Sequence, residues 1–335
     1  MSTNRWLAAC LVVHALACAD ATGPTLPPGT LLAAGRGPLE WSRDGRTIYY
    51  NGDPTVGGHI FTVDVITHTS RLVVNCAILP VETIAGLAYT TCVSPPVLHL
   101  LSEGHDSILS TAAFWFMRSE DRMRLLYLGE DVNGVNGGFD TLHVVDFARG
   151  TQHSTTTHLN MRVAAVAPSG TEMFVQSYNP SFLLVNVDNS TQRVLQDTIL
   201  NNFIYEPRLI GWNDAGVWIF RHGLGIYDPV TGTWRSGGTG GLPGNSAVVE
   251  RPGRRAALWS ATCLGEDSAG CVRGLFMLHV VDPLRNAPPL QILRFETEDV
   301  QRYARGIEGV AFSPDGQSLA YTFGNELRLV ALPGN

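Results

Sequence analysis

The residues of this chain best spaced for metal chemistry lie in one acidic, glycine-rich segment, residues 130–140. Hard cations such as Ca²⁺ bind alternating oxygen donors on a loop of this kind. The candidate ligands are Asp131, Asn133, Asn136 and Asp140. Val135 occupies the ligand position after Asn133, and the last two candidates fall one residue late. A hairpin loop with Asn-Gly turns explains the segment as well, so we predict no metal and keep a weak calcium site as the alternative.

No other residue pattern matches a catalytic signature. The ten histidines include no His-Glu-x-x-His pair, and no Gly-x-Ser-x-Gly elbow presents a hydrolase nucleophile. All 23 basic residues are arginine, which excludes Schiff-base and P-loop lysine chemistry. The net charge of −7 comes without a basic stripe, which argues against nucleic-acid binding. We therefore predict no catalytic residues and no cofactor.

Four cysteines form two close pairs in the sequence, Cys76 with Cys92 and Cys263 with Cys271. Neither pair has the CxxC spacing of a zinc site. In an exported chain, an even number of cysteines indicates disulfides. We expect each pair to form a bridge that closes a loop within one repeat.

The N-terminus indicates export. Residues 1–17 carry Arg5 and then an apolar run too short to span a bilayer, in outline a secretory signal peptide. Ala15-Leu16-Ala17-Cys18 resembles the bacterial lipobox, which implies lipid attachment at Cys18. Residues 18–29 are a polar tether rich in proline and glycine, so the folded domain is expected over residues 30–335. The alternative is an ordinary cleaved signal with an incidental Cys18.

Ala19 follows the candidate lipid site Cys18. An aspartate at this position would resemble the signal that retains lipoproteins in the inner membrane, and this chain has alanine instead. The expected address is therefore the outer membrane, facing the periplasm or the surface, with membrane contact through the lipid anchor only.

The elements that must position any site are short β-strands. Residues 310–323 alternate apolar side chains on both sides of Pro314-Asp315-Gly316, which predicts a β-hairpin. Strands ending in an acid recur at Asp64, Asp146, Asp188, Asp228 and Asp282. The steps from Asp146 to Asp188 and Asp228 are 42 and 40 residues, whereas Asp64 and Asp146 lie 82 apart. A hidden unit near Glu103 is therefore expected, although its turn chemistry is poor.

A tight turn between apolar strands precedes each acid-ended strand, as at Arg43-Asp44-Gly45-Arg46. A four-stranded meander with a period of about 40–45 residues is typical of a propeller blade. Counting to Val330 gives seven units, with residues 31–34 supplying the last strand that closes the ring. We predict an all-β, seven-bladed propeller, with six blades as the alternative.

Phe312-Ser313-Pro314-Asp315-Gly316 and Trp41-Ser42-Arg43-Asp44-Gly45 resemble the blade turn of the TolB-type, WD-repeat-like propeller family. The second copy has arginine at the proline position, and the middle blades are degenerate. The resemblance implies a propeller over residues 30–335, in a family of mostly binding or scaffolding proteins. TolB's extra N-terminal domain has no room in this chain, so its specific role does not carry over.

Most acids in the pattern have a structural explanation, because an aspartate at a strand end accepts hydrogen bonds from nearby amides and fixes the turn. The same role is predicted for the tight-turn residues Asp44, Asp214 and Asp315. His143 and His279 occupy equivalent strand positions and are assigned to the repeat. We expect a monomeric, non-catalytic lipoprotein that binds an envelope protein, peptide or glycan. Recognition is expected at the long connections around residues 133–138 and Cys263–Cys271.

The alternative function is an envelope lyase or hydrolase acting on glycan or peptide, with its catalytic residues in the central channel. The lining of the channel discriminates between the two functions. Clustered histidine, arginine and carboxylate groups with perturbed pKa values favour the enzyme. Small apolar and hydroxyl groups favour the binding module.

Overall fold

The computed structural model describes residues 27–333 apart from 53–57, 114, 130–140, 157–160, 178–181, 196–207, 221–223, 237–245, 268–269, 284–287, 301–302 and 304–305. The predicted signal peptide and Cys18 lie outside the described residues. So do the calcium candidates Asp131, Asn133, Asn136 and Asp140.

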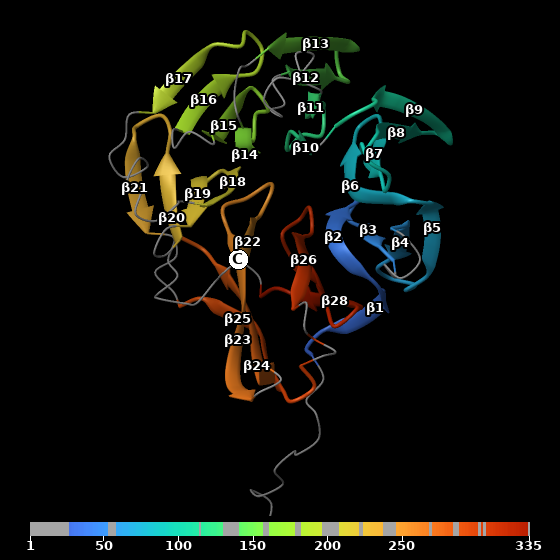
Figure 1. Cartoon of the computed structure of the whole chain (residues 1–335), viewed down its shortest axis with the longest axis vertical. Coiled ribbons are helices and arrows are strands. Elements are labelled where there is room, and N and C mark those ends of the chain that lie inside the picture. Colours follow the sequence, from blue (N-terminus) through green and yellow to red (C-terminus); the bar gives the residue numbers. More distant parts are fainter. Residues whose placement is uncertain are drawn as a thin grey trace, which may run out of the picture.

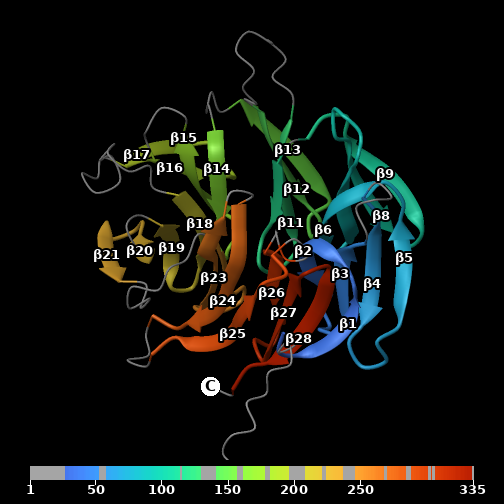
Figure 2. The same cartoon turned by 60° about the horizontal axis from the view of Figure 1, so that its bottom comes forward.

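Seven four-stranded antiparallel sheets form a ring, and the described residues contain no helix (Figure 1). The all-β prediction and the count of seven blades are confirmed, which removes the six-bladed alternative. In each of blades 1 to 6 the strands follow chain order from the centre of the ring to the rim. Figure 2 shows the same ring tilted, with the first strands around the axis and the last strands outside.

The strands are 4–8 residues long, apart from the two middle strands of blade 6, which have 12 residues each. Blade 1 consists of β2 (Arg36–Trp41), β3 (Thr47–Asn51), β4 (Ile60–Asp64) and β5 (Ser70–Val74). Blade 2 consists of β6 (Ala77–Thr83), β7 (Gly86–Thr91), β8 (Leu98–Ser102) and β9 (His105–Ser110). Blade 3 consists of β10 (Trp115–Arg118), β11 (Arg124–Gly129), β12 (Thr141–Asp146) and β13 (Thr151–Thr156). Blade 4 consists of β14 (Met161–Val166), β15 (Glu172–Ser177), β16 (Phe182–Asn186) and β17 (Gln192–Leu195).

The remaining blades complete the ring. Blade 5 consists of β18 (Arg208–Asn213), β19 (Gly216–Phe220), β20 (Leu224–Asp228) and β21 (Thr233–Ser236). Blade 6 consists of β22 (Ser246–Val249), β23 (Ala256–Asp267), β24 (Gly270–Val281) and β25 (Leu290–Thr297). Blade 7 consists of β26 (Ile307–Phe312), β27 (Ser318–Phe323), β28 (Glu326–Ala331) and, from the other end of the chain, β1 (Thr30–Ala34).

Pairing between the two ends of the chain closes the ring, as predicted. β1 pairs antiparallel with β28, Thr30 opposite Leu329 and Ala34 opposite Glu326. Blades 7 and 1 also approach closely at the axis, where a Cβ atom on Gly309 would lie 1.9 Å from the Gly37 carbonyl oxygen. Glycine is required there because any side chain would collide with backbone.

The tight turns share one hydrogen-bonding device in blades 1, 3 and 7. Ser42, Ser119 and Ser313 each donate a hydroxyl hydrogen bond of 2.5–2.6 Å to the aspartate two residues on. Each aspartate then accepts a backbone amide at 3.0 Å, as Asp315 does from Gln317. The side chains thereby fix the turn locally. The resembling Ser-x-Asp segments are thus structural.

Several acids at strand ends also fix turns, but blade 4 differs. Asp64 Oδ1 accepts from the amides of Ile66 and Thr67, as predicted. In blade 4, however, this position is held by Asn186, and Asp188 instead binds Arg124 of blade 3 at 2.8 Å. An asparagine oxygen serves the turn as well as a carboxylate does, so the acid was a misleading marker there.

In blade 5, Asn213 is the residue that caps the tight turn, because its Oδ1 accepts from the Ala215 amide at 3.0 Å. The turn role predicted for Asp214 is wrong. Asp214 accepts from the Gly253 amide of blade 6 instead, at 3.2 Å.

The core consists of seven apolar clusters, one between each pair of adjacent blades. Between blades 6 and 7 it holds fourteen described buried residues, including Phe276, Phe295, Tyr303 and Phe323 with ring centroids 4.6–5.4 Å apart about Phe323. Between blades 1 and 2 the described cluster has four, Ile60, Ala77, Leu87 and Tyr89. Since apolar burial holds blades together, this interface is the least tightly sealed.

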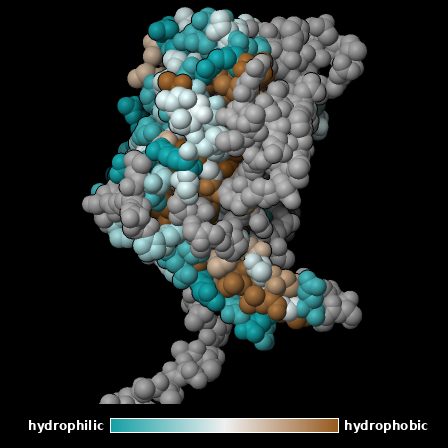
Figure 3. All heavy atoms as spheres, turned by 90° about the vertical axis from the view of Figure 1, so that its left-hand side faces the viewer, coloured by the Kyte–Doolittle hydropathy of each residue, from teal (hydrophilic) through white to brown (hydrophobic). Residues whose placement is uncertain are grey.

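Hydrophobic residues also reach the outer surface, mostly as small patches, with a larger one toward the end of the molecule where β23 and β24 project (Figure 3). Leu264 and Val272 are exposed on that hairpin. Within the described part of the chain, no helix is long and apolar enough to span a membrane.

Candidate functional site

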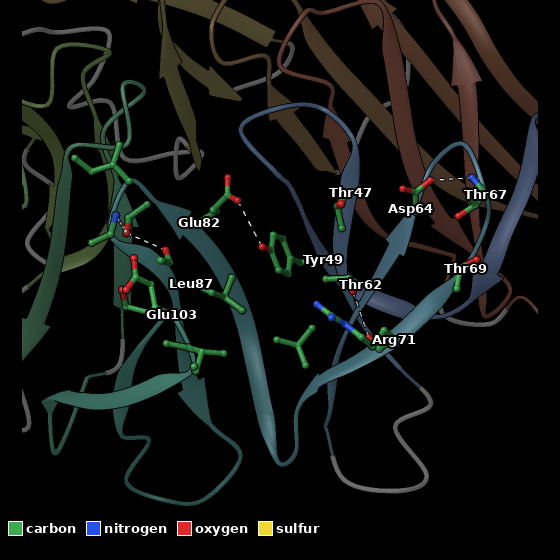
Figure 4. Close-up of a pocket in the computed structure, with 18 residues that line it drawn as sticks. Thr47, Tyr49, Thr62, Asp64, Thr67, Thr69, Arg71, Glu82, Leu87 and Glu103 are labelled. Carbon is green, nitrogen blue, oxygen red and sulfur yellow. Dashed lines mark hydrogen bonds between the residues drawn. The ribbon is translucent and has the colours of Figure 1, made fainter.

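A cleft of about 1040 Å³ opens between blades 1 and 2, where their apolar contact is smallest. One wall comes from β3, β4 and β5, and the other from β6, β7 and the turn after β8 (Figure 4). Glu82 of β6 and Tyr49 of β3 face one another at the inner end. The lining side chains are mainly hydroxyl and charged groups: Thr47, Tyr49, Thr62, Asp64, Thr67, Thr69, Arg71, Glu82, Thr83, Ser102 and Glu103.

The backbone of blade 2 shapes the floor of the cleft. Gly86 has φ +143°, and a Cβ atom there would lie 2.2 Å from the Leu101 carbonyl oxygen. A side chain is therefore excluded by conformation and by contact. Thr83 fixes the same turn, since its hydroxyl donates to the Gly86 carbonyl at 2.9 Å and accepts from the Ala85 amide. The cleft is built on a rigid turn.

Several polar groups in the cleft are already used by the protein. The Asp64 carboxylate accepts two backbone amides, and these hydrogen bonds, first from Thr67 and then from Ile66, lower its pKa. The Thr62 hydroxyl donates to the Arg71 carbonyl at 3.4 Å. Burial, followed by the negative charge of Glu40, raises the pKa of Tyr49. Tyr49 is therefore a neutral phenol that presents one ring face and a hydroxyl.

Other polar side chains have no internal use. Among the described residues, the side chains of Thr47, Thr69, Arg71, Ser102 and Glu103 make no hydrogen bond or ion pair. They lie on both walls and come from five separate strands or turns. The cleft thus offers hydroxyl groups, one guanidinium and one carboxylate to a ligand.

The inner end of the cleft is closed by an ion pair between blades. Arg122 of blade 3 donates through Nη1 to Glu82 Oε2, which also accepts from the Arg43 amide at 2.5 Å. The pair is largely buried, with side-chain exposures of 8% for Arg122 and 16% for Glu82. Burial lowers the pKa of Arg122. Glu82 lines the cleft and the adjacent Val81 lines the cavity of the central channel, so the pair lies where the two adjoin.

The channel itself holds a second cavity of about 290 Å³, lined by first strands or adjoining turns of blades 1, 2, 3, 5, 6 and 7. Its described wall is mostly apolar, with Glu40, Arg118 and Arg251 at the end nearest the tight turns. No histidine is among the lining residues. The channel wall combines charged groups, which favour the enzyme, with small apolar groups, which favour the binding module. It therefore does not discriminate between the two functions.

Both predicted disulfides are confirmed. Cys76 and Cys92 bridge the ends of β6 and β7 with Cα atoms 5.1 Å apart, and Cys263 and Cys271 join β23 to β24 at 5.8 Å. Each lies within one blade. No group of three or more histidine, cysteine or acidic side chains is placed to hold a metal ion within the described part of the chain.

Of the two loops expected to carry recognition, one lies among the described residues. Residues 133–138 lie outside the described residues, whereas Cys263–Cys271 forms the projecting end of the β23–β24 hairpin. His143 stacks on Tyr127 with ring centroids 4.6 Å apart, in keeping with a structural role. Sequence reasoning missed the cleft, because its residues come from several segments between 47 and 104 with no shared spacing. The poor turn chemistry of the unit near Glu103 was the one available signal.

No sequence family model matches the chain, and no curated protein matches it. Structural comparison finds 1126 matching chains, so the fold is widely shared. Among them is an oligogalacturonate lyase in complex with manganese, with a TM-score of 0.63 and 12% identity, covering 93% of this chain and 97% of that one. At this identity the similarity shows the fold alone. The chain is a seven-bladed β-propeller.

Proposed function

We propose that this chain is a non-catalytic binding module of the bacterial cell envelope, and that the cleft between blades 1 and 2 binds a glycan. One observation carries the proposal, the convergence of unused hydroxyl, guanidinium and carboxylate groups beside the Tyr49 ring. Sugar hydroxyls both donate and accept hydrogen bonds, so they match side chains of both kinds. A neutral aromatic ring offers the apolar face against which a sugar ring packs.

The charges in the cleft favour a neutral glycan over an acidic one. Glu103 has no cationic partner in the described structure, whereas the Asp64 carboxylate lies 3.6 Å from Arg46 Nε. A carboxylate accepts hydrogen bonds from sugar hydroxyls but repels an anion. Among the described residues that line the cleft, Arg71 is the cation without an internal partner. We therefore expect neutral oligosaccharides to bind more tightly than acidic ones of equal length.

The comparison with solved structures supports a glycan only by analogy. The oligogalacturonate lyase is named for a glycan substrate, and its fold covers nearly the whole of this chain. Because one fold hosts many functions, the fold alone does not identify a ligand, and the residues of the cleft must do so.

The cellular context belongs to the same proposal. The lipobox resemblance at Cys18 and the tether over residues 18–29 support a lipoprotein attached by acyl chains, in the outer membrane. The Ser-Pro-Asp-Gly turn of blade 7 supports a relationship to TolB-type propellers. The partner is an envelope glycan, bound by a monomer.

A specific observation favours a second candidate function, a glycan lyase or hydrolase acting in the channel. Burial, followed by the charge of Asp214, raises the pKa of Glu120, and Arg251 lies close enough to oppose that shift. A carboxyl group whose pKa is raised beside a cation is an arrangement that acid catalysis uses. Turnover of oligosaccharides by the purified domain, detected as new reducing ends or unsaturated sugars, would establish this function in place of the first.

The binding proposal is tested by titrating neutral and acidic oligosaccharides into residues 27–335 by calorimetry. Tyr49→Ala and Glu103→Gln are the cleft variants, and Glu298→Gln is the matched control because Glu298 is an exposed glutamate in the segment between blades 6 and 7. A lost charge-assisted hydrogen bond weakens binding by about 10-fold or more, so Glu103→Gln should show this and the control should not. Equal affinity in all variants, or no glycan binding by the wild type, contradicts the proposal.

A further inference from the structure

The channel cavity is an apolar tube with a polar end. Leu39, Val81, Ile210, Val248 and Val310 contribute apolar wall from five different blades. The polar groups, Glu40, Arg118 and Arg251, come from blades 1, 3 and 6. A volume of about 290 Å³ accommodates a small molecule. The channel cavity is separate from the cleft, because the two have no lining residue in common.

Arg118 is fully engaged by the protein. Its Nε and Nη2 atoms lie 2.9 and 2.8 Å from the same Glu40 oxygen, and its Nη1 donates to the Ser119 carbonyl at 3.2 Å. Glu40 is thereby committed to Arg118. Glu40 makes no ion pair with Arg251 in the described structure, but its negative charge acts to raise the pKa of Arg251 against the effect of burial.

Arg251 is the unusual group. Its Nε is buried and has no hydrogen-bond partner, and its Nη1 meets only the Met117 sulfur, at 3.5 Å. No described acid makes an ion pair with it. Burial, followed by repulsion from Arg118, lowers the pKa of Arg251 to about 10. Arg251 is a partly buried arginine whose buried Nε has no partner, so a group that supplies negative charge and acceptors would be stabilised there.

The nearby acids do not fill this role. Glu120 Oε2 is buried without a hydrogen-bond partner, and Glu120 makes no ion pair with Arg251 in the described structure. Its charged form is disfavoured by burial and by Asp214, which itself is held by the Gly253 amide. Glu250 is taken by Arg255, whose Nε lies 2.9 Å from Oε2.

We propose that the channel mouth is a binding site for a small aliphatic carboxylate, with the carboxylate on Arg251 and the alkyl chain in the apolar tube. A planar guanidinium matches a carboxylate in shape and charge. The surrounding Val81, Val248 and Val310 would bury the chain. The site goes beyond the proposed glycan cleft and shares no lining residue with it.

The test is calorimetric titration of residues 27–335 with butyrate, hexanoate and octanoate, and with hexanamide as the uncharged match. Affinity should rise by about 3- to 4-fold per added methylene until the tube is full. Hexanamide should bind at least about 10-fold more weakly than hexanoate, because it cannot pair with a guanidinium. Equal binding of hexanoate and hexanamide, or no binding of any carboxylate, overturns the proposal.

Two variants in the same turn give a matched comparison. Arg251→Met removes the guanidinium and keeps an apolar chain, and Arg254→Met removes a half-exposed arginine that lies 3.7 Å from Asp282 outside the channel. The first should weaken hexanoate binding by about 10-fold or more and the second should leave it unchanged. Val248→Trp, which fills the tube and leaves Arg251 in place, should abolish binding. Unaltered hexanoate binding in Arg251→Met or in Val248→Trp contradicts the assignment.

The carboxylate could arrive on a free acid or at the end of a peptide. A tripeptide ending in leucine, with a free or an amidated C-terminus, distinguishes these sources. Tighter binding of the free-acid peptide than of hexanoate assigns the site to peptide C-termini, and weaker binding assigns it to small carboxylates. Equal binding of free and amidated peptides at this site would contradict recognition of the carboxylate.

Discussion

Arg122 of blade 3 forms an ion pair with Glu82 of blade 2 at the point where the cleft meets the channel. The other oxygen of Glu82 lies 3.5 Å from the Tyr49 hydroxyl of blade 1, so one carboxylate joins three blades. These contacts add polar bonds where the apolar contact between blades 1 and 2 is small.

Removing one partner of this pair should destabilise the ring. Arg122→Met leaves Glu82 buried without its cation, and we expect a loss of about 3 kcal/mol in the free energy of unfolding. Urea unfolding followed by circular dichroism measures the change. The double variant Arg122→Met with Glu82→Met should lose less than the sum of the two single variants, since the two side chains are coupled. Additive losses would show that the pair contributes little.

Glycine is required at position 86 for two reasons that can be separated. Gly86→Ala meets both an unfavourable φ of +143° and a contact of 2.2 Å with the Leu101 oxygen. Gly104→Ala, in the next turn, has φ +83° with no atom within 4 Å. We expect about 1–2 kcal/mol of destabilisation for Gly104→Ala and clearly more for Gly86→Ala, measured by thermal unfolding. Equal losses would mean that the floor of the cleft yields to the side chain.

The disulfides should stabilise the domain by constraining the unfolded chain. Loops of 16 and 8 residues correspond to about 3 and about 2.5 kcal/mol in the chain-entropy treatment. The Cys76→Ser/Cys92→Ser variant should therefore unfold at lower temperature than Cys263→Ser/Cys271→Ser. In each variant, reductant should lower the melting temperature only through the bridge that remains. An unchanged melting temperature after full reduction of the wild type would contradict this expectation.

Two histidines, His279 buried and His143 partly buried, should make the domain less stable in acid. Burial lowers the pKa of His143 and of His279 below the ordinary value of 6.5. The unfolded chain then binds protons that the folded one refuses, so stability falls as pH drops through the unfolded value. His143→Gln/His279→Gln should flatten this loss between about pH 7 and pH 5, with exposed His105→Gln as the control. An unaltered pH slope in the double variant would refute the assignment.

Lipid attachment makes a prediction about location. A diacylated Cys18 would hold the mature protein on the membrane, because two or more acyl chains give stable anchoring. Expression of full-length Cys18→Ser should move the protein from the membrane to the soluble fraction after cell lysis. Cys10→Ser is the matched control within the same segment. Membrane association that persists in Cys18→Ser would rule out this anchor.

The sequence by itself determined the blades. The Ser-x-Asp turns and the alternating strands act through contacts a few residues apart, so local spacing predicts them, and cysteines 8 and 16 residues apart are constrained to pair locally. In blade 4 the turn residue is Asn186, because the turn requires an oxygen and not a charge. The search for acid-ended strands therefore assigned this role to Asp188, which was wrong.

Only the tertiary structure decided where a ligand could bind. Glu82 and Tyr49 are 33 residues apart, and Arg251 is more than 130 residues from Met117 and Arg118, yet closure of the ring brings them together. The cleft exists because one interface between blades buries less apolar surface than the others, a difference that summed packing produces and no single motif records. The unpaired state of Arg251 likewise depends on which neighbours the fold leaves to it.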